Sequence, residues 1–341
     1  MSRNAGDIES CAFGYLLSIN RFSHSKTGKN FLVFFGFGGV KYDIMNAPPR
    51  NNPVSIWRKQ VIRRNAVTRA GTAIVFLTLA LFVGAEARAI TPPRADFNGD
   101  GKPDWVLTNP STRQTAIWFM NDATLLSGAV GPTLPPNWLL LDAAQFDSPT
   151  TSADFFLVNT STLQTAVWYM NGASFLHGAL GPTLPAGWGP GVVQDFNGDG
   201  HPDLGLGQHH SDKTAVWYLN GTTLIGGAYG PNQPAGWKGV GAADFNGDGH
   251  PDLLWWNPTT RQTAIWYLNG VQFLSGVLGP TLPAGWAPVL IDDFNRDGKP
   301  DLVLWNQSTR QTAIWHLNNN VFVSGVLGPT LPAGWILVGP R

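Results

Sequence analysis

Short runs of apolar residues recur along most of the chain, and polar turn residues separate them. In one stretch, Lys238–Phe245 is rich in small residues, Asp252–Asn257 is densely apolar, and Gln262–Gly270 alternates between apolar and polar positions. A fourth run, Val271–Gly279, follows the Asn-Gly pair that ends the third. Asn-Gly favours a two-residue hairpin, because a type I′ turn needs a positive φ at both central residues. The pattern therefore predicts a unit of four antiparallel strands.

This four-strand unit recurs with a period of about 49 residues from Asp96 onward. A phenylalanine marks the same position in each unit, at Phe97, Phe146, Phe196, Phe245 and Phe294. A period of this length with four short strands is typical of a β-propeller blade. The small first strand suits the innermost place, where blades crowd around the axis. We therefore expect an all-β fold, a five-bladed β-propeller of four-stranded antiparallel blades.

The order of the strand types predicts how the ring closes. The innermost type occurs five times, at Leu139–Gln145, Gly189–Gln194, Lys238–Ala243, Ala287–Asp292 and Ile336–Pro340. The other types begin at Trp105, and the segment ITPPRA before Asp96 holds two prolines, which argue against a central strand. We therefore expect the C-terminal strand to complete the blade that starts at Trp105, so that one chain forms a monomeric ring. The alternative is an arc of five blades that a partner chain closes.

The first 89 residues have a different pattern. A basic stretch, Arg58–Arg69, precedes an apolar run of 16 residues, Ala70–Ala85, and Ala87–Ala89 offers small residues for cleavage. This order is typical of a signal peptide. The apolar run is shorter than the roughly 20 residues that span a bilayer, which disfavours a retained anchor. We therefore expect a protein that is secreted or at the cell surface, with no stable membrane span after signal removal.

These patterns divide the chain into three parts. Residues 90–341 form the five-repeat propeller, and residues 45–89 form the signal-peptide region, with Met45 as an alternative start. Residues 1–44 are then a mis-called start or a disordered extension. The only cysteine, Cys11, lies in that first part, so no disulfide stabilises the exported part.

Composition and charge narrow the function. Charged residues make up 13 % of the chain, while Gly (40), Pro (26) and Trp (15) are plentiful, which suits a turn-rich β protein. From Ile90 onward there are 18 Asp, no Glu and 10 Lys or Arg, a net charge of −8. No run supplies the clustered basic face that nucleic-acid binding needs, so we expect no nucleic-acid partner.

Nine residues, DFNGDGHPD, occur at Asp195–Asp203 and again at Asp244–Asp252, and altered copies occur at Asp96–Asp104 and Asp293–Asp301. Oxygen-bearing side chains stand at positions 1, 3, 5 and 9, a glycine at position 6 allows a sharp turn, and the position-7 carbonyl adds an oxygen. Hard oxygen donors without cysteine suit Ca²⁺ rather than zinc or copper. Clustered carboxylates also need a cation to stay ionised together. The loops therefore predict four calcium sites.

The predicted ligands stand at positions 1, 3, 5, 7 and 9 of each loop, and position 7 acts through its carbonyl. They are Asp96, Asn98, Asp100, Lys102 and Asp104; Asp195, Asn197, Asp199, His201 and Asp203; Asp244, Asn246, Asp248, His250 and Asp252; and Asp293, Asn295, Asp297, Lys299 and Asp301. The second repeat, Gln145–Asp154, loses the aspartates of positions 1 and 5, so we expect no calcium there. The loop is not an EF-hand, because position 12 is apolar where an EF-hand has a bidentate glutamate.

Asp-x-Asn-x-Asp-Gly-x-x-Asp loops on four-stranded repeats of this length resemble the FG-GAP/VCBS repeat family. Its propellers include the integrin α-subunit head and calcium-binding fungal lectins. The resemblance extends over Asp96–Arg341 and implies metal-ligand roles for positions 1, 3, 5 and 9 of the four loops. Two features depart from the family: five units instead of the seven common in it, and flanks that read SGVLGPTLPAGW. The resemblance therefore bears on the metal and the fold more than on the partner.

Two tryptophans recur in each unit. One lies in the alternating strand, where we expect it to pack between sheets, at Trp118, Trp168, Trp217, Trp266 and Trp315. The other follows the proline-rich connection, at Trp138, Trp188, Trp237, Trp286 and Trp335. This second set either packs between blades or forms shallow sugar-stacking platforms, since flat aromatic rings suit the apolar faces of sugars.

No motif for catalysis is present in the sequence. The chain has no Gly-x-Ser-x-Gly, His-Glu-x-x-His or P-loop pattern, and its units are nearly interchangeable, whereas enzymes on propellers usually depart from symmetry at the site. We therefore expect a non-enzymatic, calcium-stabilised binding or adhesion module, with carbohydrate as the favoured ligand and an extracellular protein next. The alternatives are a polysaccharide-acting enzyme with catalytic groups around the axis, and a scaffold that binds nothing specific.

Overall fold

The computed structural model describes residues 94–147 and 152–341 in full, and the backbone of residues 31–35, 42–46 and 59–61. The chain divides into two compact units, Met1–Val83 and Gly84–Arg341. In the first unit, β1 (Phe31–Phe35), β2 (Tyr42–Asn46) and β3 (Lys59–Val61) form an antiparallel sheet in that order. The apolar run 70–85 and the cleavage site at 87–89 lie outside the described residues, so the signal peptide stays a prediction.

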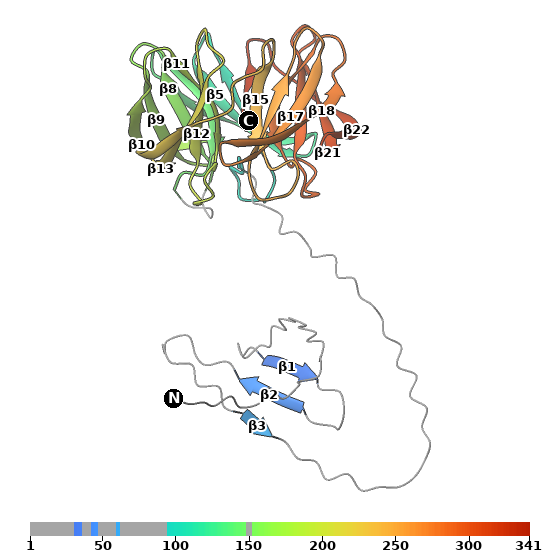
Figure 1. Cartoon of the computed structure of the whole chain (residues 1–341). Helices are drawn as coiled ribbons and strands as arrows, with labels where there is room; N and C mark the ends of the chain where they lie inside the picture. Colours follow the sequence, from blue (N-terminus) through green and yellow to red (C-terminus); the bar gives the residue numbers. More distant parts are fainter. Residues whose placement is uncertain (1–30, 36–41, 47–58, 62–93, 148–151) are drawn as a thin grey trace, which may run out of the picture. The chain divides into compact units, whose positions relative to one another are not determined.

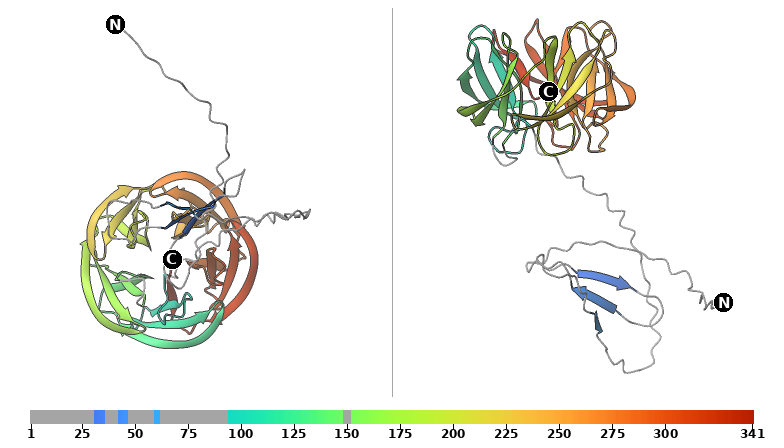
Figure 2. Two further views of the ribbon diagram at one scale, coloured as in Figure 1. Left: turned by 90° about the horizontal axis from the view of Figure 1, so that it is seen from below. Right: turned by 60° about the vertical axis from the view of Figure 1, so that its left-hand side comes forward.

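The second unit is a ring of five four-stranded antiparallel sheets (Figures 1 and 2). Blade 1 consists of β23 (Ile336–Gly339), β4 (Trp105–Asn109), β5 (Gln114–Asn121) and β6 (Thr124–Thr133). Blade 2 consists of β7 (Trp138–Ala144), β8 (Asp154–Asn159), β9 (Gln164–Asn171) and β10 (Ser174–Thr183). Blade 3 consists of β11 (Trp188–Gln194), β12 (Asp203–Gln208), β13 (Thr214–Asn220) and β14 (Thr223–Tyr229).

Blade 4 consists of β15 (Lys238–Ala243), β16 (Asp252–Trp256), β17 (Gln262–Asn269) and β18 (Gln272–Thr281). Blade 5 consists of β19 (Trp286–Asp292), β20 (Asp301–Asn306), β21 (Gln311–Asn318) and β22 (Val321–Thr330). The described residues of the ring contain no helix. The predicted fold class, a five-bladed β-propeller, is confirmed.

The last strand closes the ring. β23 pairs antiparallel with β4, with Ile336 opposite Thr108 and Leu337 opposite Leu107. The first strands of neighbouring blades contact one another, which places them innermost around the axis. The predicted closure is therefore confirmed, and the alternative of an open arc is wrong, because the chain supplies its own last strand.

Local sequence explains the hairpins between the third and fourth strands. The second residue of the Asn-Gly pair has a positive φ, of 57° at Gly172, 58° at Gly221 and 60° at Gly270. Asp122 and Asn319 take the same conformation in the other two blades, with φ of 53° and 57°. Glycine, asparagine and aspartate adopt this left-handed conformation at the lowest cost, so the hairpins form beside the predicted pairs. Only this one residue of each turn has a positive φ, and Asn171 pairs with Ser174, so the predicted type I′ turn with Asn-Gly at its centre is wrong.

The hydrophobic core lies between neighbouring blades. The five phenylalanines at loop position 2 are all buried, with exposed fractions between 1 and 5 %. Phe97, for example, contacts Phe155 edge to face, with ring centroids 5.7 Å apart. Burying a side chain of this size stabilises a fold by about 1.5–3 kcal/mol. Each acidic loop is therefore tied to the core by its second residue.

Charged groups from the two ends of the ring region meet near the axis. The Arg94 guanidinium donates to the carbonyl of Val193 at 2.9 Å. The buried Asp142 carboxylate accepts hydrogen bonds from the N–H groups of Ala143 and Arg341, at 2.8 and 3.1 Å. Burial raises the pKa of Asp142, and the charges of Arg94 and Arg341 oppose that rise.

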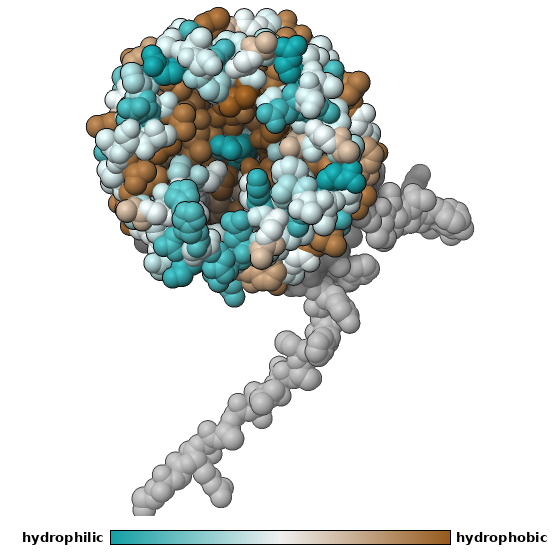
Figure 3. All heavy atoms as spheres, turned by 90° about the horizontal axis from the view of Figure 1, so that it is seen from above, coloured by the Kyte–Doolittle hydropathy of each residue, from teal (hydrophilic) through white to brown (hydrophobic). Residues whose placement is uncertain are grey.

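The face seen in Figure 3 is hollowed at its centre, and hydrophobic residues line the hollow.

Candidate functional site

Three acidic loops join the innermost strand of their blade to the second strand, and the first loop, Asp96–Asp104, precedes β4, because the innermost strand of blade 1 is β23. In blade 3, the carboxylate of Asp195 at position 1 accepts hydrogen bonds from the N–H groups of Gly198 and Gly200, at 2.7 and 2.8 Å. Both glycines have a positive φ, 76° and 87°, which would strain most other residues. In the other three loops, the carboxylate at position 1 accepts hydrogen bonds from the backbone N–H groups of positions 5 and 6. The loop backbone therefore curls around the position-1 carboxylate, as the spacing predicts.

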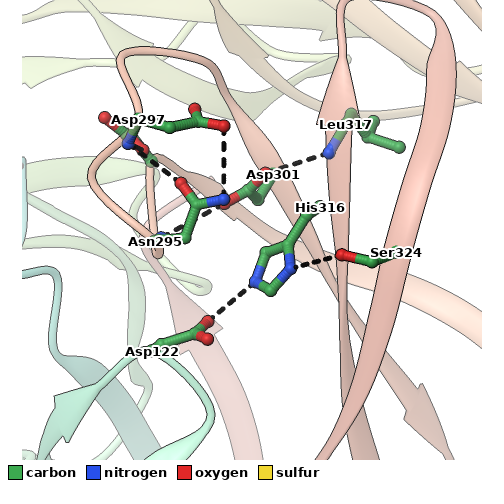
Figure 4. Close-up of polar contacts among 8 residues, drawn as sticks. Asp122, Asn295, Asp297, Asp301, His316, Leu317 and Ser324 are labelled. Carbon is green, nitrogen blue, oxygen red and sulfur yellow. Dashed lines mark hydrogen bonds and ion pairs between the residues drawn. The ribbon is translucent and has the colours of Figure 1, made fainter.

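Positions 3 and 5 are exposed and bonded to each other. In blade 3, the Asn197 side-chain oxygen accepts from the Asp199 N–H at 2.9 Å, and the Asn197 amide donates to the Asp199 carboxylate at 2.9 Å. The N–H of His201 at position 7 donates to the same carboxylate at 2.9 Å. Figure 4 shows the corresponding side chains of blade 5, Asn295 and Asp297, side by side in their loop.

Position 9 has a different environment, because its carboxylate is fully buried. In blade 3, Asp203 accepts from the N–H of Phe196 at 2.9 Å and from the N–H of Leu219, on the third strand, at 2.9 Å. In blade 2, where we expect no calcium, Asp154 makes the same two bonds, to Phe146 at 3.1 Å and to Met170 at 2.9 Å. The spacing argument gave position 9 only a metal role. It missed this hydrogen-bonding role, which joins the loop to the third strand of its blade.

The buried aspartates at position 9 have perturbed acidities. Burial raises the pKa of Asp104, Asp154 and Asp301 to about 7. Burial also raises the pKa of Asp203 and Asp252, to about 6. Hydrogen bonds from backbone N–H groups oppose the rise, and in the first loop the charges of Asp96 and Asp100 add to it. A nearby cation would favour the ionised form of each buried carboxylate.

The donor set of the four loops fits a hard cation by chemistry, since each offers carboxylate, amide and carbonyl oxygens on a glycine-bearing turn. Within residues 94–147 and 152–341, no three carboxylate, imidazole or thiol side chains form a complete metal-binding group. The carboxylates at positions 1 and 9 accept hydrogen bonds from backbone N–H groups. The ligand roles, and the lack of a site in the second repeat, therefore stay predictions.

Replacing Asp154 by asparagine is expected to reduce the dependence of stability on pH. Its pKa in the folded protein, about 7, lies well above the ordinary 3.8. The folded state therefore binds the proton more tightly than the unfolded chain, and the free energy of unfolding falls as the pH rises from about 4 to about 7. A pKa change of this size corresponds to at most about 4 kcal/mol.

Urea unfolding at pH 5 and pH 8 measures this effect. The variant loses stability at both pH values, because an asparagine side chain offers one accepting oxygen to two N–H donors. The stability difference between the two pH values should nevertheless shrink relative to wild type. Asp212→Asn, at an exposed turn, serves as the control and should leave that difference unchanged. If the stability difference between the two pH values is as large in Asp154→Asn as in wild type, Asp154 is not the group responsible for it.

The mid-strand tryptophans pack as expected. Each is half-buried, and its indole lies over a glycine of the neighbouring outermost strand. In blade 2, a Cβ added to Gly178 would come within 2.9 Å of the Trp168 ring. Trp168 also packs against the core between blades 1 and 2 and lies 4.8 Å from the Phe175 ring. The glycine of the repeated Ser-Gly or His-Gly pair is therefore required for close packing of the tryptophan.

The second set of tryptophans helps to line equivalent grooves in two blades. In blade 3, Trp188 and Trp217 line a groove of about 330 Å³ together with Pro185. In blade 5, Trp286 and Trp315 line a groove of about 310 Å³ together with Pro283. Both grooves extend to the outermost strand of the blade. Each groove therefore combines one tryptophan of each type.

The remaining members of the set are also half-buried. Trp138 lines a separate cavity of about 210 Å³. Trp335 packs against the core between blades 5 and 1. The carbonyl of Trp237 accepts a hydrogen bond from the Gln233 side chain at 2.6 Å. Four of the five therefore pack against buried clusters, namely Trp138, Trp188, Trp286 and Trp335, and those in the two grooves also line a groove.

Sequence reasoning missed a hydrogen-bonded chain between blades 5 and 1. His316 contacts Asp122 at 2.9 Å through Nε2 and Ser324 at 3.0 Å through Nδ1 (Figure 4). Between blades 4 and 5 the same place holds Tyr267, whose hydroxyl donates to Asn319 at 2.6 Å. Because Tyr267 and His316 make equivalent contacts, the hydrogen bonds of His316 are explained as a contact between neighbouring blades. The sequence feature that could have indicated this contact is a histidine at a strand position where every other blade has phenylalanine or tyrosine.

A family model confirms part of the resemblance. Residues 195–255 match the FG-GAP-like repeat, a span that begins at one acidic loop and contains the next. Among curated protein sequences, none matches this chain. In the described part of the chain, no helix is long and apolar enough to cross a membrane.

Several solved structures are distantly similar. The Tc holotoxin pore of Photorhabdus luminescens has 17 % identity and a TM-score of 0.39, and the match covers 84 % of this chain but only 14 % of that one. A protein of unknown function from Bacteroides caccae has 14 % identity and a TM-score of 0.37, with 66 % of this chain and 73 % of that one covered. A functionally unknown protein from Desulfotomaculum acetoxidans has 14 % identity and a TM-score of 0.33, with 67 % of each chain covered. Likenesses this distant say nothing about function.

Proposed function

We propose that this protein is an exported, calcium-stabilised adhesion or binding module that holds carbohydrate in its tryptophan-lined grooves. The propeller fold and the FG-GAP-like repeat support the general part of this proposal, a binding or protein-interaction scaffold. Such scaffolds are typically non-enzymatic. The basic and apolar N-terminal pattern supports export, and the donor chemistry of the four loops supports calcium.

The observation that carries the carbohydrate proposal is the pair of equivalent grooves in blades 3 and 5. Each has two tryptophan rings and a proline on its walls. Aromatic rings stack well on the apolar faces of sugars, and a half-buried ring keeps one face available for this. Neither groove is lined by a charged residue, which suits a neutral ligand.

Repetition adds to this argument. The proline-rich connection and both tryptophans occur in all five units of the sequence. A single shallow groove binds a sugar weakly, but several grooves on one ring can engage a branched or polymeric glycan together. Linked sites of this kind can raise the overall affinity by about 10²–10⁴-fold over one site.

A protein partner is the second candidate, because the outermost strands carry exposed apolar side chains. In blade 1, Leu126 and Val130 are 54 and 71 % exposed, and in blade 5, Val323 and Leu327 are 62 and 67 % exposed. Such residues recur on the outermost strand of every blade. Exposed apolar patches often mark protein-binding surfaces.

A glycan array probed with the exported protein tests the proposal. We expect binding to a set of neutral glycans, and we expect Trp188→Ala and Trp286→Ala each to weaken it by about tenfold, the value of one lost stacking contact. Leu126→Ser, on an outermost strand away from both grooves, is the matched control and should bind like wild type. Loss of glycan binding in the control alone would place the glycan site on the outermost strands and contradict the grooves. Cleavage of any glycan would contradict a non-enzymatic module, and N-terminal sequencing of the exported protein tests the cleavage site.

A further inference from the structure

Blade 3 departs from the other four blades at one group of positions. On its second strand, Gly205 stands where the others have Val106, Phe156, Leu254 and Val303. Two residues later, Gly207 stands where the others have Thr108, Val158, Trp256 and Trp305. In the connection to the next blade, Gln233 replaces the buried Leu134, Leu184, Leu282 and Leu331. Two side chains are therefore missing from one strand, and a polar glutamine stands where the other blades bury a leucine.

At Gly205 the Val192 side chain fills the space that a side chain would take, but beside Gly207 the space opens into a cavity between blades 3 and 4. Its volume is about 310 Å³, and Gly205, Gly207 and Gln233 are among its lining residues. A Cβ added to Gly207 would meet no atom within 4 Å, so the space beside this residue is open. The buried cluster at this junction contains only Val192, Phe196, Val216 and Ala242, the smallest of the five clusters in the described ring. The junction is thus underpacked where the sequence breaks the repeat.

The mouth of the cavity carries polar groups that the other blades lack. Gln208 and His209 stand where the other blades have an asparagine followed by proline, threonine or glutamine. The His209 ring lies against Gly189 of the innermost strand, and it is exposed. The side-chain amide of Gln208 makes no hydrogen bond with another described residue, although it lines the cavity. The cavity lining therefore combines apolar walls with a few hydrogen-bonding groups.

The walls add one further unpartnered group. Trp255 lines the cavity and is 3 % exposed, and its indole N–H has no hydrogen-bond partner within the described residues. A buried N–H without an acceptor is uncommon and calls for an explanation. No aspartate, glutamate, lysine or arginine lines the cavity, so its lining offers no charge to bind an ion.

We propose that this cavity binds an uncharged small molecule with an apolar body and one polar end. The valine, leucine and phenylalanine walls suit the body, and Gln208 and His209 suit a hydroxyl or amide at the mouth. A cavity of this volume lies within the range of small-molecule sites, which are mostly apolar with a few placed polar groups. A sugar fits less well, because most of its hydroxyls would face apolar walls without partners. This site is distinct from the tryptophan grooves, although it shares Leu206, Ala215 and Val216 with the groove of blade 3, and it does not depend on the proposed carbohydrate binding.

Calorimetric titration with 2-naphthol, which has an apolar body and one hydroxyl, tests the proposal on the exported protein. We expect one saturable site. Gly207→Trp should weaken binding by at least about tenfold, because it places in the open space the residue that blades 4 and 5 already hold there. Gly207→Val, which copies blade 2, keeps the test usable if the larger residue disturbs folding. Thr223→Trp adds the same ring at an exposed position of the same blade and should leave the affinity unchanged.

Two results would overturn the proposal. One is the absence of saturable 2-naphthol binding to wild type, which would make the cavity a tolerated packing defect. The other is equal affinity in wild type and a folded Gly207→Trp variant, which would place the ligand elsewhere. Tighter binding of methyl glucoside than of 2-naphthol, lost in Gly207→Trp, would also overturn it by assigning the cavity to a sugar. A failed glycan array leaves this test unaffected, because Gly207 lines the cavity and lines neither tryptophan groove.

Discussion

Removal of calcium with EDTA is expected to lower the melting temperature of this protein sharply. If the free Ca²⁺ concentration is roughly tenfold above the dissociation constant, each site adds about 1.4 kcal/mol by mass action. Four sites together then contribute about 5–6 kcal/mol, which is comparable to the whole stability of many domains. The effect should be large because the propeller has no disulfide, and three of the four loops connect two strands of their blade.

Melting curves with calcium, with EDTA, and with calcium restored measure this contribution. Asp199→Ala removes the position-5 carboxylate of one loop, and we expect it to remove about a quarter of the calcium-dependent shift. Asp212→Ala removes an exposed aspartate outside the loops of the same blade and should keep the full shift. Because both variants lose one negative charge, the comparison separates a ligand from a general charge effect. Identical melting of the wild type in calcium and EDTA would rule out structural calcium.

Deletion of residues 336–341 is expected to abolish cooperative folding of the ring or to lower its melting temperature by a comparable amount. The deletion leaves the N–H and C=O groups of one edge of β4 unpaired. It also removes Leu337 and Val338 from the cores on either side of blade 1, at about 1.5–3 kcal/mol for each buried side chain. Finally, it removes the Arg341 charge, one of the two that favour the ionised form of the buried Asp142, and leaves Arg94 as the other.

Addition of a peptide with the sequence of residues 335–341 provides a stringent check. If the ring opens only for lack of its last strand, the peptide should bind the truncated protein and restore the melting transition. The same peptide with Leu337→Asp should fail, because a charge would enter the core between blades 5 and 1. A truncated protein that melts like the full chain would show that closure by β23 contributes little.

Local patterns account for most of the fold. Each hairpin depends on one residue that accepts a positive φ, and this residue is visible as the second of the pair Asn171-Gly172 and its equivalents. Strand type depends on the alternation of apolar and polar positions, and the number of innermost strands gave both the five blades and the closure. These features repeat five times, so a weak signal in one unit is supported by the others.

The candidate sites were predictable to different degrees. The spacing of the acidic loops identifies the curl around Asp195, because it arises within nine residues. It does not identify the burial of Asp203, since the donor Leu219 lies 16 residues away on another strand. The same limit applies to His316 and Asp122, which are separated by 194 residues and meet only because the ring closes.

By itself, the sequence determined the repeat, the strand order, the five blades and the acidic turns, because each depends on interactions between near neighbours in the chain. Only the tertiary structure decided which side chains fill the junctions between blades. In the sequence, Gly205 and Gly207 are two small departures from the repeat in one strand. The cavity that they help to line forms only when blade 4 packs against blade 3. Packing between blades depends on the combined volumes of residues that are far apart in sequence, so no local sequence pattern predicts it.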